Sequence, residues 1–149
     1  MLTMWTIRLL MLAAGFALAA GMAAAADPER LKLPDLANPG WKKMPNGMRY
    51  WDFKDGTGDT VVKGDTLKLH YTGWLTSGKI FDSSVQRGEP ITFGLNQLIK
   101  GWQEGVPGMK TGGRRYLEIP SALGYGDSGT GGIPPKATLI FEIEVLERK

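Results

Sequence analysis

Apolar and polar side chains alternate along residues 66–75, which is the pattern of a β-strand with one buried face. Leu67, Leu69 and Tyr71 fall on the predicted buried face, and His70 falls on the opposite, polar face. This alternation predicts a long strand, and it makes His70 an ordinary polar-face residue rather than a catalytic base.

The alternation returns in residues 137–147, near the end of the chain. Glu142 and Glu144 lie on the polar side of this second strand. We interpret that side as a solvated face, in preference to the carboxylate pair of a glycosidase. Three shorter strands, separated by turns, are predicted at 48–53, 80–81 and 114–120.

A short amphipathic helix is predicted between the strands at 80–81 and 114–120, with Asn96 as its N-cap. Its apolar stripe comprises Leu98, Ile99, Trp102 and Val106. Gly101 and Gly105 each cost about 1 kcal/mol relative to alanine, so the helix must gain its stability by packing. The predicted fold class is therefore α+β, an antiparallel sheet wrapped around one short helix.

The chain divides into three segments. Residues 1–26 have the order of a secretory signal, with a charged start, 18 uncharged residues after Arg8 and a small-residue site that ends at Ala26. We favour cleavage over an uncleaved membrane anchor, because the apolar run is short and rich in alanine and glycine. Residues 27–45 form a proline-rich lead-in, which either docks through Trp41 or is mobile. Residues 46–149 form the folded domain.

Composition narrows the possible chemistry. The chain has no cysteine and one histidine, which excludes thiolate nucleophiles, disulfides and cysteine-based metal sites. Its 21 glycines and 9 prolines favour a loop-rich, β-rich fold. The net charge of +3 is too small and too evenly spread to indicate a nucleic-acid partner.

Residues 124–129 match two glycine-rich motifs, one of dinucleotide-binding proteins and one of serine proteases, but we assign neither function to them. Residues 124–129 match G-x-G-x-x-G, but a dinucleotide site must open a helix, and residues 130–135 contain two glycines and two prolines. The G-D-S-G run within this segment mimics a serine protease nucleophile, which needs a general-base histidine. His70 is the only candidate and lies on a predicted strand, so we reject a triad.

Five segments in order over one domain are similar to the FKBP-type peptidyl-prolyl isomerases. They are residues 69–75, 78–84, 98–105, 124–126 and 133–141, and the resemblance extends over about residues 48–146. It implies an FKBP-like antiparallel half-barrel around a short helix, with a ligand pocket between helix and sheet. The implied reaction is rotation about X-Pro bonds without covalent catalysis.

The resemblance also implies roles for individual residues. Tyr71, Asp82 and Tyr125 are the expected catalytic residues, with Trp102 as the pocket floor. The expected substrate-binding residues are Phe81, Arg87, Phe93, Leu98, Ile99, Trp102, Ile133 and Phe141. The Ile99 N–H and the Tyr125 hydroxyl would bond substrate carbonyls. The sequence departs from the family at Ile91, where the family often has an aromatic residue, and in the glycine-rich loop 126–133, and both departures bear on substrate preference.

The expected partners are proline-containing polypeptides during folding, together with macrolide inhibitors whose ring mimics proline. No cofactor, metal, nucleic acid or, after signal cleavage, membrane is expected. The signal indicates export, and the lack of a cysteine pair or retention tail favours a bacterial periplasm. Two alternatives are a holdase chaperone that binds peptides in the same groove and an inactive relative. The chain lacks the inserted domain or helical arm of chaperone-leaning members, and it retains Tyr71, Asp82, Trp102 and Tyr125.

Overall fold

A computed structural model describes residues 27–149, and the predicted signal, residues 1–26, lies outside the described residues. The described chain forms a seven-stranded antiparallel sheet in the order β1-β2-β6-β7-β3-β4, with β5 also paired to β3. The strands are β1 (Lys42–Lys43), β2 (Arg49–Lys54), β3 (Thr66–Leu75), β4 (Ile80–Ser83), β5 (Ile91–Gly94), β6 (Arg114–Ile119) and β7 (Leu139–Arg148). The predicted α+β class is confirmed.

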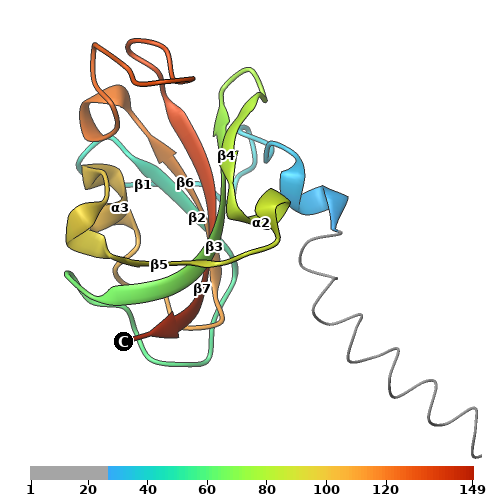
Figure 1. Ribbon diagram of the computed structural model, residues 1–149, viewed down its shortest axis with the longest axis vertical. Helices are drawn as coiled ribbons and strands as arrows, with labels where there is room; N and C mark the ends of the chain where they lie inside the picture. Colours follow the sequence, from blue (N-terminus) through green and yellow to red (C-terminus); the bar gives the residue numbers. More distant parts are fainter. Residues whose placement is uncertain (1–26) are drawn as a thin grey trace, which may run out of the picture.

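Short helices lie before and between the strands, and α3 packs against one side of the sheet (Figure 1). They are η1 (Pro28–Leu31), α2 (Ser84–Arg87), η2 (Leu95–Gln97), α3 (Lys100–Gly105) and η3 (Ser121–Leu123). A Cβ on Gly101 would lie 2.5 Å from Cγ2 of Ile119, and one on Gly105 would lie 2.8 Å from Cδ1 of Leu117. The two glycines therefore allow α3 to pack directly on β6, which offsets their poor helix propensity.

The predicted start of this helix is wrong. Asn96 belongs to the separate turn η2, and Ile99, which has no side chain able to cap, is the N-cap of α3. Leu98 and Ile99 have ψ values of 170° and 153°, so both are extended and interrupt the helical path. The apolar stripe is maintained because these extended residues still face the core, with Trp102 and Val106 buried behind them.

The predicted solvated face of β7 is also wrong at Glu142, whose side chain is 1% exposed. Arg30 of η1 covers this outer side of the sheet, and its Nε donates to Glu142 Oε1 at 3.0 Å. Arg114 Nη2 donates to the same oxygen at 2.8 Å. His70, expected on an open polar face, is buried on this side as well. Two guanidinium groups compensate the carboxylate, which is what permits its burial.

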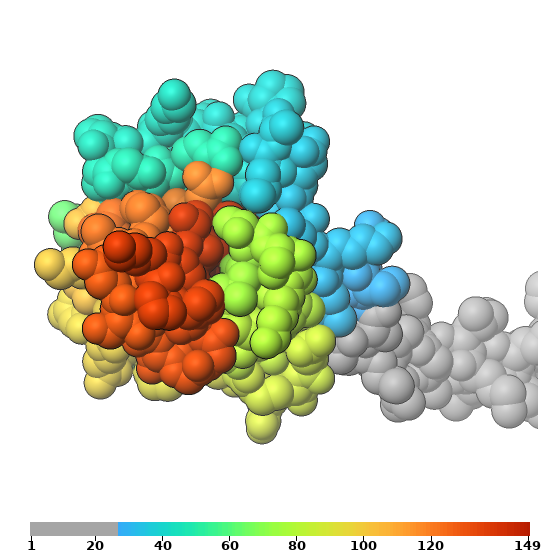
Figure 2. Space-filling model, turned by 90° about the horizontal axis from the view of Figure 1, so that it is seen from above, coloured from blue at the N-terminus to red at the C-terminus, as the bar shows by residue number. Residues whose placement is uncertain are grey.

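The lead-in belongs to the folded structure. Trp41 lies with its ring centroid 6.2 Å from those of Trp51 and Tyr116, and its indole N–H donates to Asp35 O at 2.9 Å. Strand β1 follows directly and pairs with β2, so the sheet begins before residue 46. Figure 2 shows this segment in blue along one side of the molecule.

Candidate functional site

An apolar cavity of about 390 Å³ opens between the sheet and the chain around α3. Its lining comprises Tyr71, Phe81, Asp82, Ile91, Phe93, Gln97, Leu98, Ile99, Trp102, Tyr125 and Phe141. Trp102 is buried beneath it, with its ring edge-to-face to Phe141 at 5.2 Å and to Tyr71 at 5.5 Å between centroids. These contacts fix the indole as a rigid floor.

One wall of the cavity depends on a glycine. Phe81 and Phe141 pack edge-to-face, with centroids 5.5 Å apart and planes at 89°. A Cβ on Gly73 would lie 2.5 Å from Cζ of Phe81 and 2.8 Å from Cε1 of Phe141. This glycine near the end of β3 therefore leaves the space in which the two rings meet.

Three polar side chains meet at the rim. The Tyr71 phenol donates to Asp82 Oδ2, and Arg87 donates to Asp82 Oδ1 and, at 3.1 Å, to the Tyr71 hydroxyl. Burial opposes ionisation of Asp82, but hydrogen bonds from Tyr71 and Arg87 outweigh it and hold the pKa of Asp82 below its usual value. Burial, and then the bond to Asp82, raise the pKa of Tyr71. The rim therefore presents a carboxylate and a neutral phenol at neutral pH.

Nine of the expected site residues line the cavity, namely Tyr71, Phe81, Asp82, Phe93, Leu98, Ile99, Trp102, Tyr125 and Phe141. Arg87 does not line it and instead donates hydrogen bonds to Asp82 and Tyr71 at the rim. Ile133 is not in the lining either. It is buried in the hydrophobic core, in a tight turn where its N–H donates to Thr130 O at 2.7 Å.

Gln97 is a lining residue that the sequence reasoning missed. Its amide oxygen accepts from Gly94 N at 3.3 Å, so the side chain folds back over η2 beside the cavity. The sequence signal that could have identified Gln97 as a lining residue was its position directly before Leu98 and Ile99. Ile91, noted in the sequence as a departure from the family, also lines the cavity.

Several donors at the cavity are free of protein partners. Within residues 27–149, the Ile99 N–H donates to no other backbone group, because the helix begins only at the next residue. The buried indole N–H of Trp102 likewise has no acceptor in this part of the chain. Tyr125 is 40% exposed, which leaves its hydroxyl accessible at the mouth. The cavity can therefore offer hydrogen bonds to carbonyl oxygens around an apolar floor.

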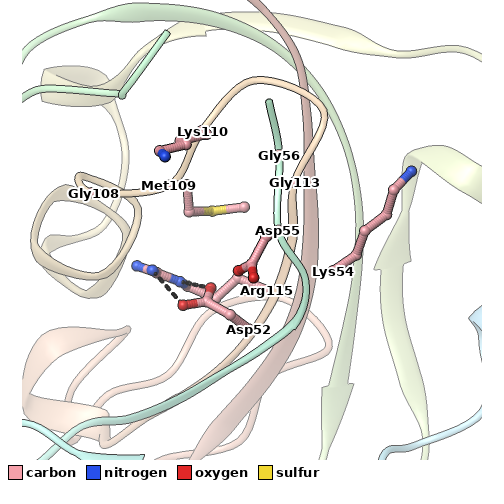
Figure 3. A pocket seen from close by; sticks show the side chains of 9 residues that line it. All are labelled: Asp52, Lys54, Asp55, Gly56, Gly108, Met109, Lys110, Gly113 and Arg115. Atoms are coloured by element: carbon pink, nitrogen blue, oxygen red, sulfur yellow. Dashed lines mark hydrogen bonds and ion pairs between the residues drawn. The ribbon is translucent and has the colours of Figure 1, made fainter. Parts of the chain in front are cut away.

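A second, polar cavity of about 180 Å³ lies beside β2 and the loop after α3 (Figure 3). Arg115 points into it and pairs with Asp52 through two hydrogen bonds, while its Nη1 donates to Gly105 O at 2.8 Å. The Lys54 side chain extends away from this pair (Figure 3). Arg115 and Asp52 thus satisfy each other's hydrogen bonds, and we interpret this cavity as a structural feature and not as a binding site.

Residues 27–149 hold no group of three or more His, Asp or Glu side chains placed to bind a metal ion. None of their helices has the length and apolarity needed to cross a membrane.

Comparison with known proteins places the chain in a family. A model of the FKBP-type peptidyl-prolyl cis-trans isomerases matches residues 58–146. An FK506-binding protein of Neisseria meningitidis serogroup B is 55% identical over 104 residues, which are 68% of this chain and 95% of that protein. The crystal structure of FkpA from Escherichia coli matches with a TM-score of 0.73 and 37% identity, over 88% of this chain and 58% of that one.

A smaller solved structure matches over nearly its whole length. That of AtFKBP13 gives a TM-score of 0.68 and 41% identity, over 73% of this chain and 98% of that one. The half-barrel, the aromatic cavity and these similarities agree, and the chain belongs to the FKBP-type family and is a peptidyl-prolyl cis-trans isomerase.

Proposed function

We propose that the apolar cavity above Trp102 binds the proline ring of exported polypeptides and accelerates rotation about the preceding peptide bond. The observation that carries this proposal is the combination of an indole floor with a carboxylate, a phenol and a guanidinium at the rim. A flat, rigid aromatic floor matches a saturated five-membered ring, and the aliphatic side chains of Leu98 and Ile99 complete the seat.

Rotation about an X-Pro bond requires no covalent chemistry. Its barrier of about 18–20 kcal/mol arises because rotation breaks amide conjugation. The twisted amide has lost part of the charge separation of the planar one, so a water-poor pocket favours it over the ground state. The buried aromatic residues of this cavity supply such surroundings.

Each polar group has a proposed role around the rotating bond. Asp82, ionised and held by Tyr71 and Arg87, interacts electrostatically with the rotating carbonyl. The Ile99 N–H and the Tyr125 hydroxyl donate to the carbonyls on either side and fix the backbone there. This arrangement orients the substrate without transferring a proton.

A second candidate function is peptide binding without turnover. Phe93 and Tyr125, both at the cavity, are 43% and 40% exposed, and so they extend the apolar surface beyond the proline seat. A holdase chaperone would use this same surface to retain unfolded segments. FK506-like macrolides would occupy the cavity in either case, as the name of the Neisseria relative suggests.

We further propose that the protein is exported to a bacterial periplasm and that its substrates fold there. The support is the order of charged, apolar and small residues over positions 1–26, which is typical of a cleaved secretory signal.

The proposed function is tested by the rate of cis-to-trans exchange in a short X-Pro peptide with the mature chain in catalytic amounts. We expect a rate increase that a macrolide abolishes and that Asp82→Asn and Trp102→Leu reduce. Asp59→Asn, which changes an exposed carboxylate outside the cavity, serves as the matched control. Unchanged exchange with folded protein that still retains unfolded chains would establish the binding function instead.

A further inference from the structure

Strand β3 has a gap in its pairing at the residues that lead into the site. On one edge, β5 pairs with its first half as far as Leu69, opposite Ile91. Strand β4 pairs with its second half from Thr72, opposite Ser83. His70 and Tyr71 lie between these two ladders, so the Tyr71 backbone has no strand partner on this edge.

The hydroxyl of Ser84 fills this gap. It accepts from Tyr71 N–H at 2.8 Å and lies 3.2 Å from Tyr71 O, to which it donates. The same oxygen lies 2.9 Å from His70 Nδ1. Ser84 is completely buried, so solvent offers no substitute for these bonds.

The three contacts match what one hydroxyl can make. A serine hydroxyl has one proton to donate and two lone pairs to accept with. Donation to Tyr71 O leaves both lone pairs for the Tyr71 N–H and for a proton on His70 Nδ1. The network therefore requires neutral His70 to carry its proton on Nδ1.

Ser84 also lies close along the chain to two of the three rim residues, Asp82 and Arg87. It is the first residue of α2, and Arg87 lies three residues later, on the same side of this single turn. Asp82 precedes it by two residues at the end of β4. A bond from Ser84 to the Tyr71 backbone thus joins the two parts of the chain whose side chains meet at the rim.

We propose that Ser84 is a positioning residue of the isomerase site. It keeps the Tyr71 phenol aligned with Asp82 and Arg87 by holding the Tyr71 backbone against the start of α2. This role rests on the proposed function of those three rim residues.

The first test compares kcat/KM for X-Pro exchange in Ser84→Ala, Ser84→Thr and Thr72→Val, all under conditions where each variant is folded. Thr72→Val is the matched control, because it removes another fully buried hydroxyl, 2.8 Å from Ser83 Oγ, one residue along β3. We expect Ser84→Ala to lower kcat/KM on the order of tenfold, since small misplacements of catalytic groups are costly. Ser84→Thr keeps the hydroxyl and should recover most of that loss, and Thr72→Val should stay within about twofold of the wild type.

The second test needs no variant. Nitrogen-15 NMR of the single histidine in the wild-type chain at pH 7.5 should show a protonated Nδ1 and an unprotonated Nε2. The opposite tautomer would require Ser84 to donate to His70 rather than to Tyr71 O, and it would overturn the proposal even if Ser84→Ala did not fold. Wild-type kcat/KM in folded Ser84→Ala would overturn it equally.

These outcomes are distinct from failure of the proposed function. If Asp82→Asn retains full activity, the rim roles themselves are wrong. If Asp82→Asn lowers kcat/KM and Ser84→Ala does not, only the positioning role of Ser84 is lost.

Discussion

Arg30 and Glu142 are 112 positions apart in the sequence, yet Nη2 of the arginine lies 2.9 Å from Oε1 of the glutamate inside the folded protein. The pair joins the N-terminal segment to the central strand β7 on the side of the sheet opposite α3. Residues before the region matched by the family model thus form part of the folded unit.

Removing this arginine should destabilise the protein. Arg30→Ala leaves a fully buried carboxylate with Arg114 as its remaining partner, so we expect a loss of about 1–3 kcal/mol in the free energy of unfolding. Urea denaturation measures this loss. Lys32→Ala, which breaks an exposed pair with Glu29, is the control and should change stability by no more than about 0.5 kcal/mol. Similar small effects for both variants would show that the buried pair contributes little.

Alanine at Gly101 should destabilise the protein, although alanine favours helices. Helix propensity alone predicts a gain of about 1 kcal/mol. The added Cβ would overlap the Ile119 side chain, however, and overpacking of this kind costs about 1–3 kcal/mol. Thermal unfolding of Gly101→Ala compared with Lys100→Ala, an exposed position on the same helix, separates the two effects. A higher Tm in Gly101→Ala would mean that α3 can move away from β6.

Stability should fall as the pH drops below about 6.5 because of His70. Burial, and then the positive charge of Arg30, lower the pKa of His70 in the folded state. Below the pKa of the unfolded chain, the unfolded state therefore binds a proton that the folded state does not, and unfolding becomes easier until the folded pKa is reached. Urea midpoints at pH 7.5 and 5.5 measure the change. His70→Gln should show a smaller pH dependence, and an equal loss in both proteins would assign it to other groups.

A lysine at position 87 should not support the full activity that Arg87 supports. The guanidinium bonds both Asp82 and the Tyr71 hydroxyl, whereas an ammonium group is a single point charge on a more flexible stem. We expect Arg87→Lys to lower kcat/KM about fivefold, which corresponds to about 1 kcal/mol for one hydrogen bond. Arg148→Lys alters a similar arginine–aspartate pair outside the cavity and should leave kcat/KM unchanged. Equal rates for both variants would show that the second bond of Arg87 is dispensable.

The sequence determined five of the seven strands, with β1 and β5 not predicted, and most of the residues that line the cavity. Alternation of side chains is a local property, and it placed β3 at 66–75 with the bounds that the structure shows. The ordered motifs located eight of the residues that line the cavity, because each motif fixes both a residue type and its place along a strand or turn, and the resemblance added Phe93 outside them. The function followed from these same segments.

Only the tertiary structure decided which faces are covered and where the helix begins. Glu142 and His70 look like surface residues in a two-residue repeat, but a distant segment covers them, and no local pattern reports such a contact. Asn96 has the chemistry of a cap, yet the extended path through Leu98 and Ile99 starts the helix later. In the sequence, Ser84 is only one of two adjacent serines. Its contact with the Tyr71 backbone becomes evident only when the pairing of β3 with β5 and β4 shows the gap at Tyr71. The contacts that decide the burial of Glu142 and the role of Ser84 join residues that are apart along the chain and that only the fold brings together.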